Sequence, residues 1–178
     1  MRKAGALAAV GLALAVLLSG CTAVGSSPKP EPSKVPASAL SALVPTYPAK
    51  LTAASAKAGT VKAANAVQSL IASTEIVHVD DQSKLVAATS SAGSYYGVGR
   101  LVTTTKGLDV ILQAQAMEKL LVQAGWVSRQ TSTNTAGYGV ALSTATAAGT
   151  SVLFLKADET PGASPAILIE LESPDLPK

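Results

Sequence analysis

Apolar residues recur at helical spacing in two segments of the chain. The first is residues 50–73, where we expect Gly59 to break or kink the early part, because glycine is a poor helix former. The second is residues 108–124, with Asp109 in the first turn and Gly125 placed to end the last turn. The expected apolar faces are Val61, Ala64, Val67, Leu70 and Ile71 in the first helix, and Val110, Ala114, Met117, Leu121 and Ala124 in the second.

The remaining apolar segments have the short, alternating pattern of strands. Residues 74–89 predict a hairpin with its turn at residues 80–83, and residues 90–93 give a second turn signal. Further strands are expected over residues 95–104, 126–133, 138–144, 152–156 and 166–171. This order and the hairpin-type spacing predict an α+β fold, with an antiparallel sheet and two helices packed on one face.

The N-terminus has the pattern of an export signal. Arg2 and Lys3 are positively charged, residues 4–18 are apolar, and small residues follow. A membrane-spanning helix needs about 20 apolar residues, so this segment is too short for a transmembrane anchor.

The four residues Leu18-Ser19-Gly20-Cys21 follow this signal, and they resemble the lipobox of bacterial lipoproteins. The resemblance covers residues 1–21 and implies that the Cys21 thiol receives a diacylglyceryl group, that the chain is cut before Cys21, and that the new amino group can be acylated. The implied address is the extracytoplasmic face of the cell membrane, with the lipid as the anchor. The alternative is a plain secretory signal with a chance cysteine.

Composition divides the rest of the chain into a tether and one domain. Residues 21–48 are rich in proline and serine and are expected to form an extended tether. Residues 49–173 are expected to form a single α+β domain, and residues 174–178 a short tail. The Ala-rich, Lys-poor composition is typical of an actinobacterial source.

Charge and cysteine content narrow the function classes further. Two of the 14 basic residues, Arg2 and Lys3, precede the expected cut, so 12 basic residues remain against 11 acidic ones. A chain so close to neutral has no nucleic-acid footprint. Cys21 is the only cysteine, so the domain has none for a disulfide.

Three patterns have the spacing of known sites but the wrong context. Gly97-Val98-Gly99-Arg100 lacks the third glycine and the following helix of a dinucleotide loop. Ser26-Ser27-Pro28-Lys29 has the Ser-x-x-Lys spacing of penicillin-binding enzymes but lies in the tether. His78 with Asp80 is a poor metal or triad candidate, because His78 is the only histidine.

The acidic and aromatic side chains have ordinary structural interpretations as well as functional ones. Paired acids at residues 80–81 and 158–159 fall in expected turns, and Glu75, Glu170 and Glu172 complete the set. Trp126 is expected in the core rather than on a binding surface. The remaining aromatic residues considered for such a surface are Tyr95, Tyr96, Tyr138 and Phe154.

No catalytic residues, metal ligands or cofactor site are therefore predicted. The sequence favours a membrane-anchored envelope lipoprotein that acts as a non-catalytic binding or accessory module for an unknown envelope protein. The first alternative is a carrier of an apolar ligand or lipid, which would need an apolar cavity of several hundred cubic ångströms. A cell-wall enzyme is the second alternative.

Overall fold

A computed structural model of the chain describes residues 36–87, 93–134, 137–160 and 162–177. The signal segment, the lipobox and the Ser26–Lys29 pattern lie outside these residues. The elements are α1 (Ala37–Ser41), α2 (Ala53–Gln68), a 3-10 turn (Ser73–Glu75), β1 (Ile76–Asp81), β2 (Lys84–Ala87), β3 (Ser94–Thr104), α3 (Val110–Ala124), β4 (Val127–Asn134), β5 (Gly137–Thr146), β6 (Gly149–Asp158) and β7 (Ala166–Glu172).

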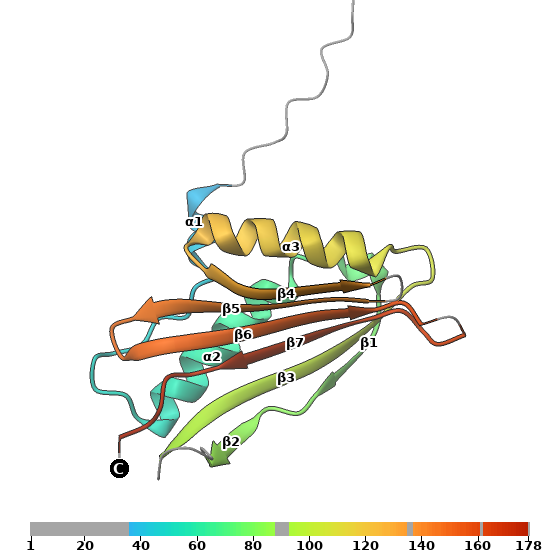
Figure 1. The fold of residues 1–178 in the computed structure, drawn as a ribbon. Helices are drawn as coiled ribbons and strands as arrows, with labels where there is room; N and C mark the ends of the chain where they lie inside the picture. Colours follow the sequence, from blue (N-terminus) through green and yellow to red (C-terminus); the bar gives the residue numbers. More distant parts are fainter. Residues whose placement is uncertain (1–35, 88–92, 135–136, 161, 178) are drawn as a thin grey trace, which may run out of the picture. The chain divides into compact units, whose positions relative to one another are not determined.

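The strands form one antiparallel sheet, confirming the predicted fold class. Its order is β1-β3-β7-β6-β5-β4, and β2 also pairs with β3. Helix α2 packs against β3 and β7, and α3 packs against β5, β6 and β7, so both lie on the same face (Figure 1). No helix among the described residues is long and apolar enough to cross a membrane.

The core fills the space between this face and the helices. Alternate side chains of a strand point to opposite faces, so every second residue of the central strands is buried. In β7 this alternation buries the residues that its sequence pattern predicted. The apolar face predicted for α3 is likewise buried at four of its five positions. Fully buried core residues include Val98, Val102, Val110, Ala114, Met117, Leu121, Leu153, Leu155, Ile167, Ile169 and Leu171.

Local hydrogen bonds set the ends of both long helices. Asp109 Oδ1 accepts from the backbone N–H of Leu112 at 2.9 Å, which makes Asp109 the N-cap of α3. Gly125 has a φ of 110°, the left-handed conformation expected of a glycine that ends a helix. In α2, Thr52 and Ser55 form a reciprocal capping box.

The predicted hairpin over residues 74–89 is wrong. Strands β1 and β2 both pair with β3, Asp81 opposite Arg100 and Lys84 opposite Gly97, so the register continues across residues 82–83 without a shift. The turn signal there is satisfied locally, because the Asp81 carboxylate accepts from the backbone N–H of Ser83 at 2.9 Å. The second turn signal falls mostly on residues 88–92, outside the described residues.

The expected domain start at residue 49 is also wrong. Residues 36–48 include α1 and pack on the domain, where Leu43 and Tyr47 are buried. The indole N–H of Trp126 donates to the Leu43 carbonyl at 3.1 Å. Trp126 is itself buried, which confirms its expected place in the core. Pro36 directly precedes α1, and the apolar residues between it and Pro48 pack on the domain.

The expected C-terminal tail is hydrogen-bonded to the sheet through Leu176. The backbone N–H of Leu176 donates to the Ser94 carbonyl at 2.7 Å, which joins this segment to the first residue of β3.

Gly59 does not break α2, contrary to expectation, because the helix runs through it. A Cβ at this position would lie 2.6 Å from Tyr47 Cε1 and 2.8 Å from the Thr46 carbonyl oxygen. Glycine therefore allows the chain after α1 to cross α2 at close range.

We expect Gly59→Ala to lower the free energy of unfolding in urea. Contacts as short as 2.6 Å place the cost in the upper part of the range of about 1–3 kcal/mol for overpacking, above the roughly 1 kcal/mol that alanine gains in a helix. Gly99→Ala is the matched control, because a Cβ there meets nothing within 4 Å. A Gly59→Ala protein more stable than the parent would contradict the close-packing explanation.

Candidate functional site

The second face of the sheet is the candidate site, because α2 and α3 both pack on the opposite one. On this face lie the alternate side chains of each strand that do not point into the core. On β6 they include Phe154, Lys156 and Asp158, and on β7 Leu168 and Glu170, all half-buried or exposed. In the part of the chain that the structure describes, no helix covers this face (Figure 1).

A trough runs along β5 on this open face. Its floor is Gly137, Gly139 and Ala141, which have at most a methyl group as side chain. Each floor residue is flanked by a taller side chain from β4 and another from β6. The three rows across the strands are Asn134–Gly137–Asp158, Ser132–Gly139–Lys156 and Gln130–Ala141–Phe154.

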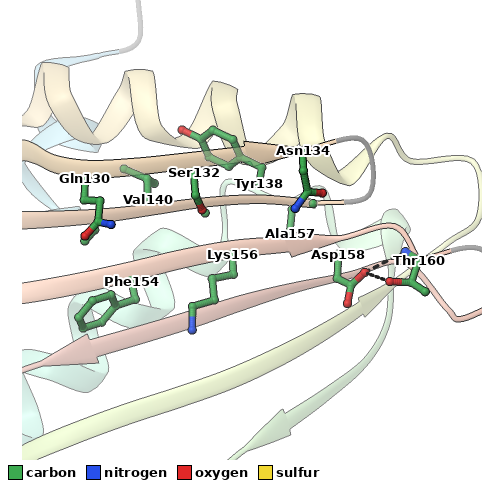
Figure 2. Close-up of a pocket in the computed structure, with 13 residues that line it drawn as sticks. Gln130, Ser132, Asn134, Tyr138, Val140, Phe154, Lys156, Ala157, Asp158 and Thr160 are labelled. Atoms are coloured by element: carbon green, nitrogen blue, oxygen red, sulfur yellow. Dashed lines mark hydrogen bonds between the residues drawn. The ribbon is translucent and has the colours of Figure 1, made fainter.

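These residues line a hollow of about 480 Å³ (Figure 2). Gln130, Lys156 and Asp158 point to the open side, whereas Tyr138 of β5 points toward α3. The Tyr138 hydroxyl donates to the Glu118 carboxylate on α3, so this phenol belongs to the helix side. Burial, followed by the hydrogen bond and charge of Glu118, raises the pKa of Tyr138.

Polar groups fix both ends of the trough. At one end Arg129 Nε donates to Ser143 Oγ at 2.7 Å, next to a bulge between Ser128 and Gln130. At the other end Asp158 Oδ1 accepts from the backbone N–H of Thr160 at 2.8 Å and from its hydroxyl at 2.5 Å. The hydroxyl bond, then the backbone bond, lowers the pKa of Asp158, so this carboxyl is ionised at neutral pH.

A second, smaller hollow of about 260 Å³ lies between β2, β3 and β7. Gly97 and Gly99 are part of its lining, beside Tyr95 and Glu172. Burial raises the pKa of Glu172, and nearby Glu170 adds to this effect. Burial and the adjacent carboxylates also raise the pKa of Tyr95. Burial is the main cause of both shifts, and the acids at the end of β7 add to it.

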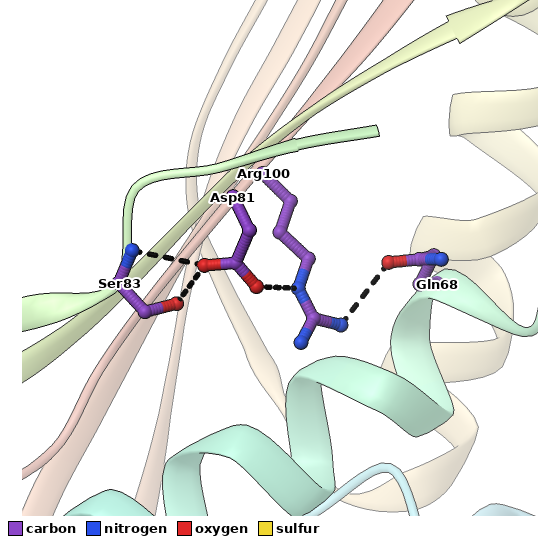
Figure 3. A network of polar contacts seen from close by, with 4 residues as sticks. All are labelled: Gln68, Asp81, Ser83 and Arg100. Atoms are coloured by element: carbon purple, nitrogen blue, oxygen red, sulfur yellow. Dashed lines mark hydrogen bonds and ion pairs between the residues drawn. The ribbon is translucent and has the colours of Figure 1, made fainter. Parts of the chain in front are cut away.

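The segment Gly97–Arg100 is part of β3, so it is not a phosphate loop. Arg100 points to the helix side, where it is largely buried. Its Nε lies 2.9 Å from Asp81 Oδ2, and its Nη1 donates to Gln68 Oε1 at 3.1 Å (Figure 3). This network joins the edge of the sheet to the last turn of α2, and every member has a structural role.

The other chemically interesting residues are dispersed. His78 and Asp80 are exposed on β1, the edge of the sheet opposite to β4. Asp80 accepts from Gln82 Nε2 at 3.1 Å. Among the described residues, no three His, Cys, Asp or Glu side chains lie close enough together to hold a metal ion. Glu75 accepts from the Thr105 hydroxyl, a contact that ties the start of β1 to the loop after β3.

No family model, curated protein or solved structure matches this chain. The candidate site therefore depends on its geometry alone. Sequence reasoning treated the β5 segment only as a possible strand and missed the trough. The signal was present in Gly137, Gly139 and Ala141, which alternate with larger residues and so fall on one face.

We expect Asp81→Asn to lower the free energy of unfolding at neutral pH by about 1–2 kcal/mol, a modest effect because solvent screens this half-exposed carboxylate. The Ser83 hydroxyl bond, with lesser help from Arg100, lowers the pKa of Asp81 in the folded state. The stabilisation is therefore complete above the unfolded pKa and is lost as pH falls through the folded one.

Urea unfolding of parent and variant at neutral and acid pH measures this difference. The matched control is Asp80→Asn, which removes an exposed carboxylate that is bonded only to its neighbour Gln82. Equal losses for both variants, or a difference that grows toward acid pH, would contradict the assigned role of Asp81.

Proposed function

We propose that this protein is a lipid-anchored envelope lipoprotein whose domain is a non-catalytic binding module. The anchor is the lipidated Cys21, on the extracytoplasmic face of the cell membrane. The observation that carries the binding role is the open face of the sheet, with its trough along β5.

The position of the trough favours a binding module over a lipid carrier. A carrier needs an enclosed apolar space, usually between the sheet and its helices. Here that space is filled by large side chains such as Met117, Leu121 and Trp126. The trough instead lies outside the core, and five of the six side chains that flank its floor carry an amide, a hydroxyl or a charge. A lipid chain in it would desolvate these groups without replacing their hydrogen bonds.

The placement of titratable groups disfavours the enzyme alternative. Nucleophilic or acid–base catalysis needs its groups within hydrogen-bond reach of one another. His78 lies on β1, across the whole sheet from the trough. Lys156 and Asp158 are in the trough, but Lys156 lies 3.8 Å from Glu170 and Asp158 is bonded to Thr160.

For the anchor, we expect Cys21→Ala to abolish labelling by an alkyne-bearing fatty acid and to release the protein from the membrane fraction. The thioether that holds the lipid forms only on the cysteine sulfur. Ser19→Ala is the control, because it keeps a small residue before the cut and should leave labelling intact. A Cys21→Ala protein that still sediments with membranes would contradict lipid anchoring.

For the binding face, we expect a photo-crosslinking amino acid at Gln130 to give a discrete adduct in intact cells. The same residue at Gln123, exposed on α3, tests the helix side of the domain. Adducts from Gln130 that disappear on Gly139→Val, which fills the trough, would support the proposal. Adducts of equal yield from both positions, or from Gln123 alone, would contradict it.

A further inference from the structure

We infer that the trough along β5 binds a linear saccharide with free hydroxyl groups. This inference rests on the proposed binding function and adds the chemical class of the ligand.

The walls of the trough match the hydrogen-bonding character of a sugar. Gln130 and Asn134 carry amides and Ser132 carries a hydroxyl, so each of these groups has both a donor and an acceptor, and the Thr160 hydroxyl, which donates to Asp158, adds an acceptor. Sugar hydroxyls have the same dual character. Phe154, in the third row, adds an aromatic surface opposite Gln130, on which the C–H face of a sugar ring can pack.

The charges in the trough favour a ligand without a strong charge of its own. Lys156 and Asp158 lie two residues apart on the same side of β6, one cationic and one anionic. A strongly acidic ligand would meet Asp158, and a strongly basic one would meet Lys156. An apolar ligand would bury both charges without compensation, which is costly. A neutral polyol accepts from the ammonium group and donates to the carboxylate.

The shape of the trough suits a narrow chain rather than a compact molecule. From Gly137 to Ala141 the floor extends about 13 Å, and the strands on either side lie about 10 Å apart. The floor residues have no side chain beyond a methyl group, so a flat ring can approach the backbone. The trough has about 480 Å³ of space, which is in the range of small-molecule sites.

An extended peptide fits the same trough less well. Peptides that bind to sheets gain most of their affinity by adding a strand to an exposed edge. The floor of this trough is β5, which is paired with β4 on one side and β6 on the other. Its backbone groups are therefore used within the sheet, and recognition has to come from side chains.

The test uses the full chain with Cys21→Ser, which keeps the domain and removes the site of lipidation. The probes are β-1,4-linked tetrasaccharides of glucose and of N-acetylglucosamine, followed by amide chemical shifts in solution. We expect saturable shifts along β4, β5 and β6 with at least one probe. Phe154→Ala is expected to weaken binding about tenfold or more, as loss of an aromatic anchor does.

Two glycine variants test whether the saccharide binds in the trough or elsewhere on the open face. Gly139→Val fills the floor, where a Cβ would lie 3.1 Å from Ser132 Oγ, and is expected to abolish binding. Gly99→Val makes the same change on β3, where a Cβ meets nothing within 4 Å, and is expected to leave binding unchanged. If Gly139→Val fails to fold, the Phe154→Ala result decides.

The inference is overturned if neither tetrasaccharide shifts these strands at millimolar concentration, or if the Gly139→Val protein folds and binds as well as the parent. It is also overturned if an unstructured tetrapeptide shifts the same strands while the sugars do not. In each case the Gln130 crosslinking experiment is independent. An adduct at Gln130 without sugar binding would still support the proposed binding module and would overturn only the saccharide as its ligand.

Discussion

The two-residue alternation of the sheet, with one face covered by helices, is the constraint on which the structure depends. Each central strand sends alternate side chains into one shared core under α2 and α3. A shift of one residue in any strand would exchange its buried and open sets. The same alternation determines the composition of the open face, because residues excluded from the core are free to be small, polar or charged. The trough along β5 is therefore a direct product of the register that builds the core.

Much of this fold could be predicted because its long elements have a clear period. The apolar face of α3, its N-cap Asp109 and its terminal Gly125 follow from sequence spacing alone. So does the buried side of β7, where Ile167, Ile169 and Leu171 alternate with polar or less buried residues. In these elements, local preference and tertiary packing favour the same structure, which is why single-sequence reasoning succeeds.

The features that the sequence did not predict depend on contacts between segments that are far apart in the chain. Residues 80–83 have turn composition, but pairing with β3 holds them in an extended edge. Gly59 predicted a break in the helix. The structure shows instead that glycine is needed there because Tyr47, from outside the helix, approaches this position closely. The trough was missed for a related reason. Small residues on one strand form a hollow only when taller side chains flank them, and the flanking rows come from β4 and β6, whose register the sequence does not reveal.

The contact between the start of the domain and Trp126 has a mechanical consequence. Residues 36–48 enter the domain through α1 and the Leu43–Trp126 hydrogen bond, beside the junction of α3 and β4. Leu43 and Tyr47 of this segment belong to the same buried cluster as Trp126, so the start of the domain is part of the core. Force applied to the chain before α1 would load this packed segment first, because residues 36–48 precede every strand. Such a load would be carried by side-chain packing in the core, whereas the hydrogen bonds between the strands hold the register of the open face.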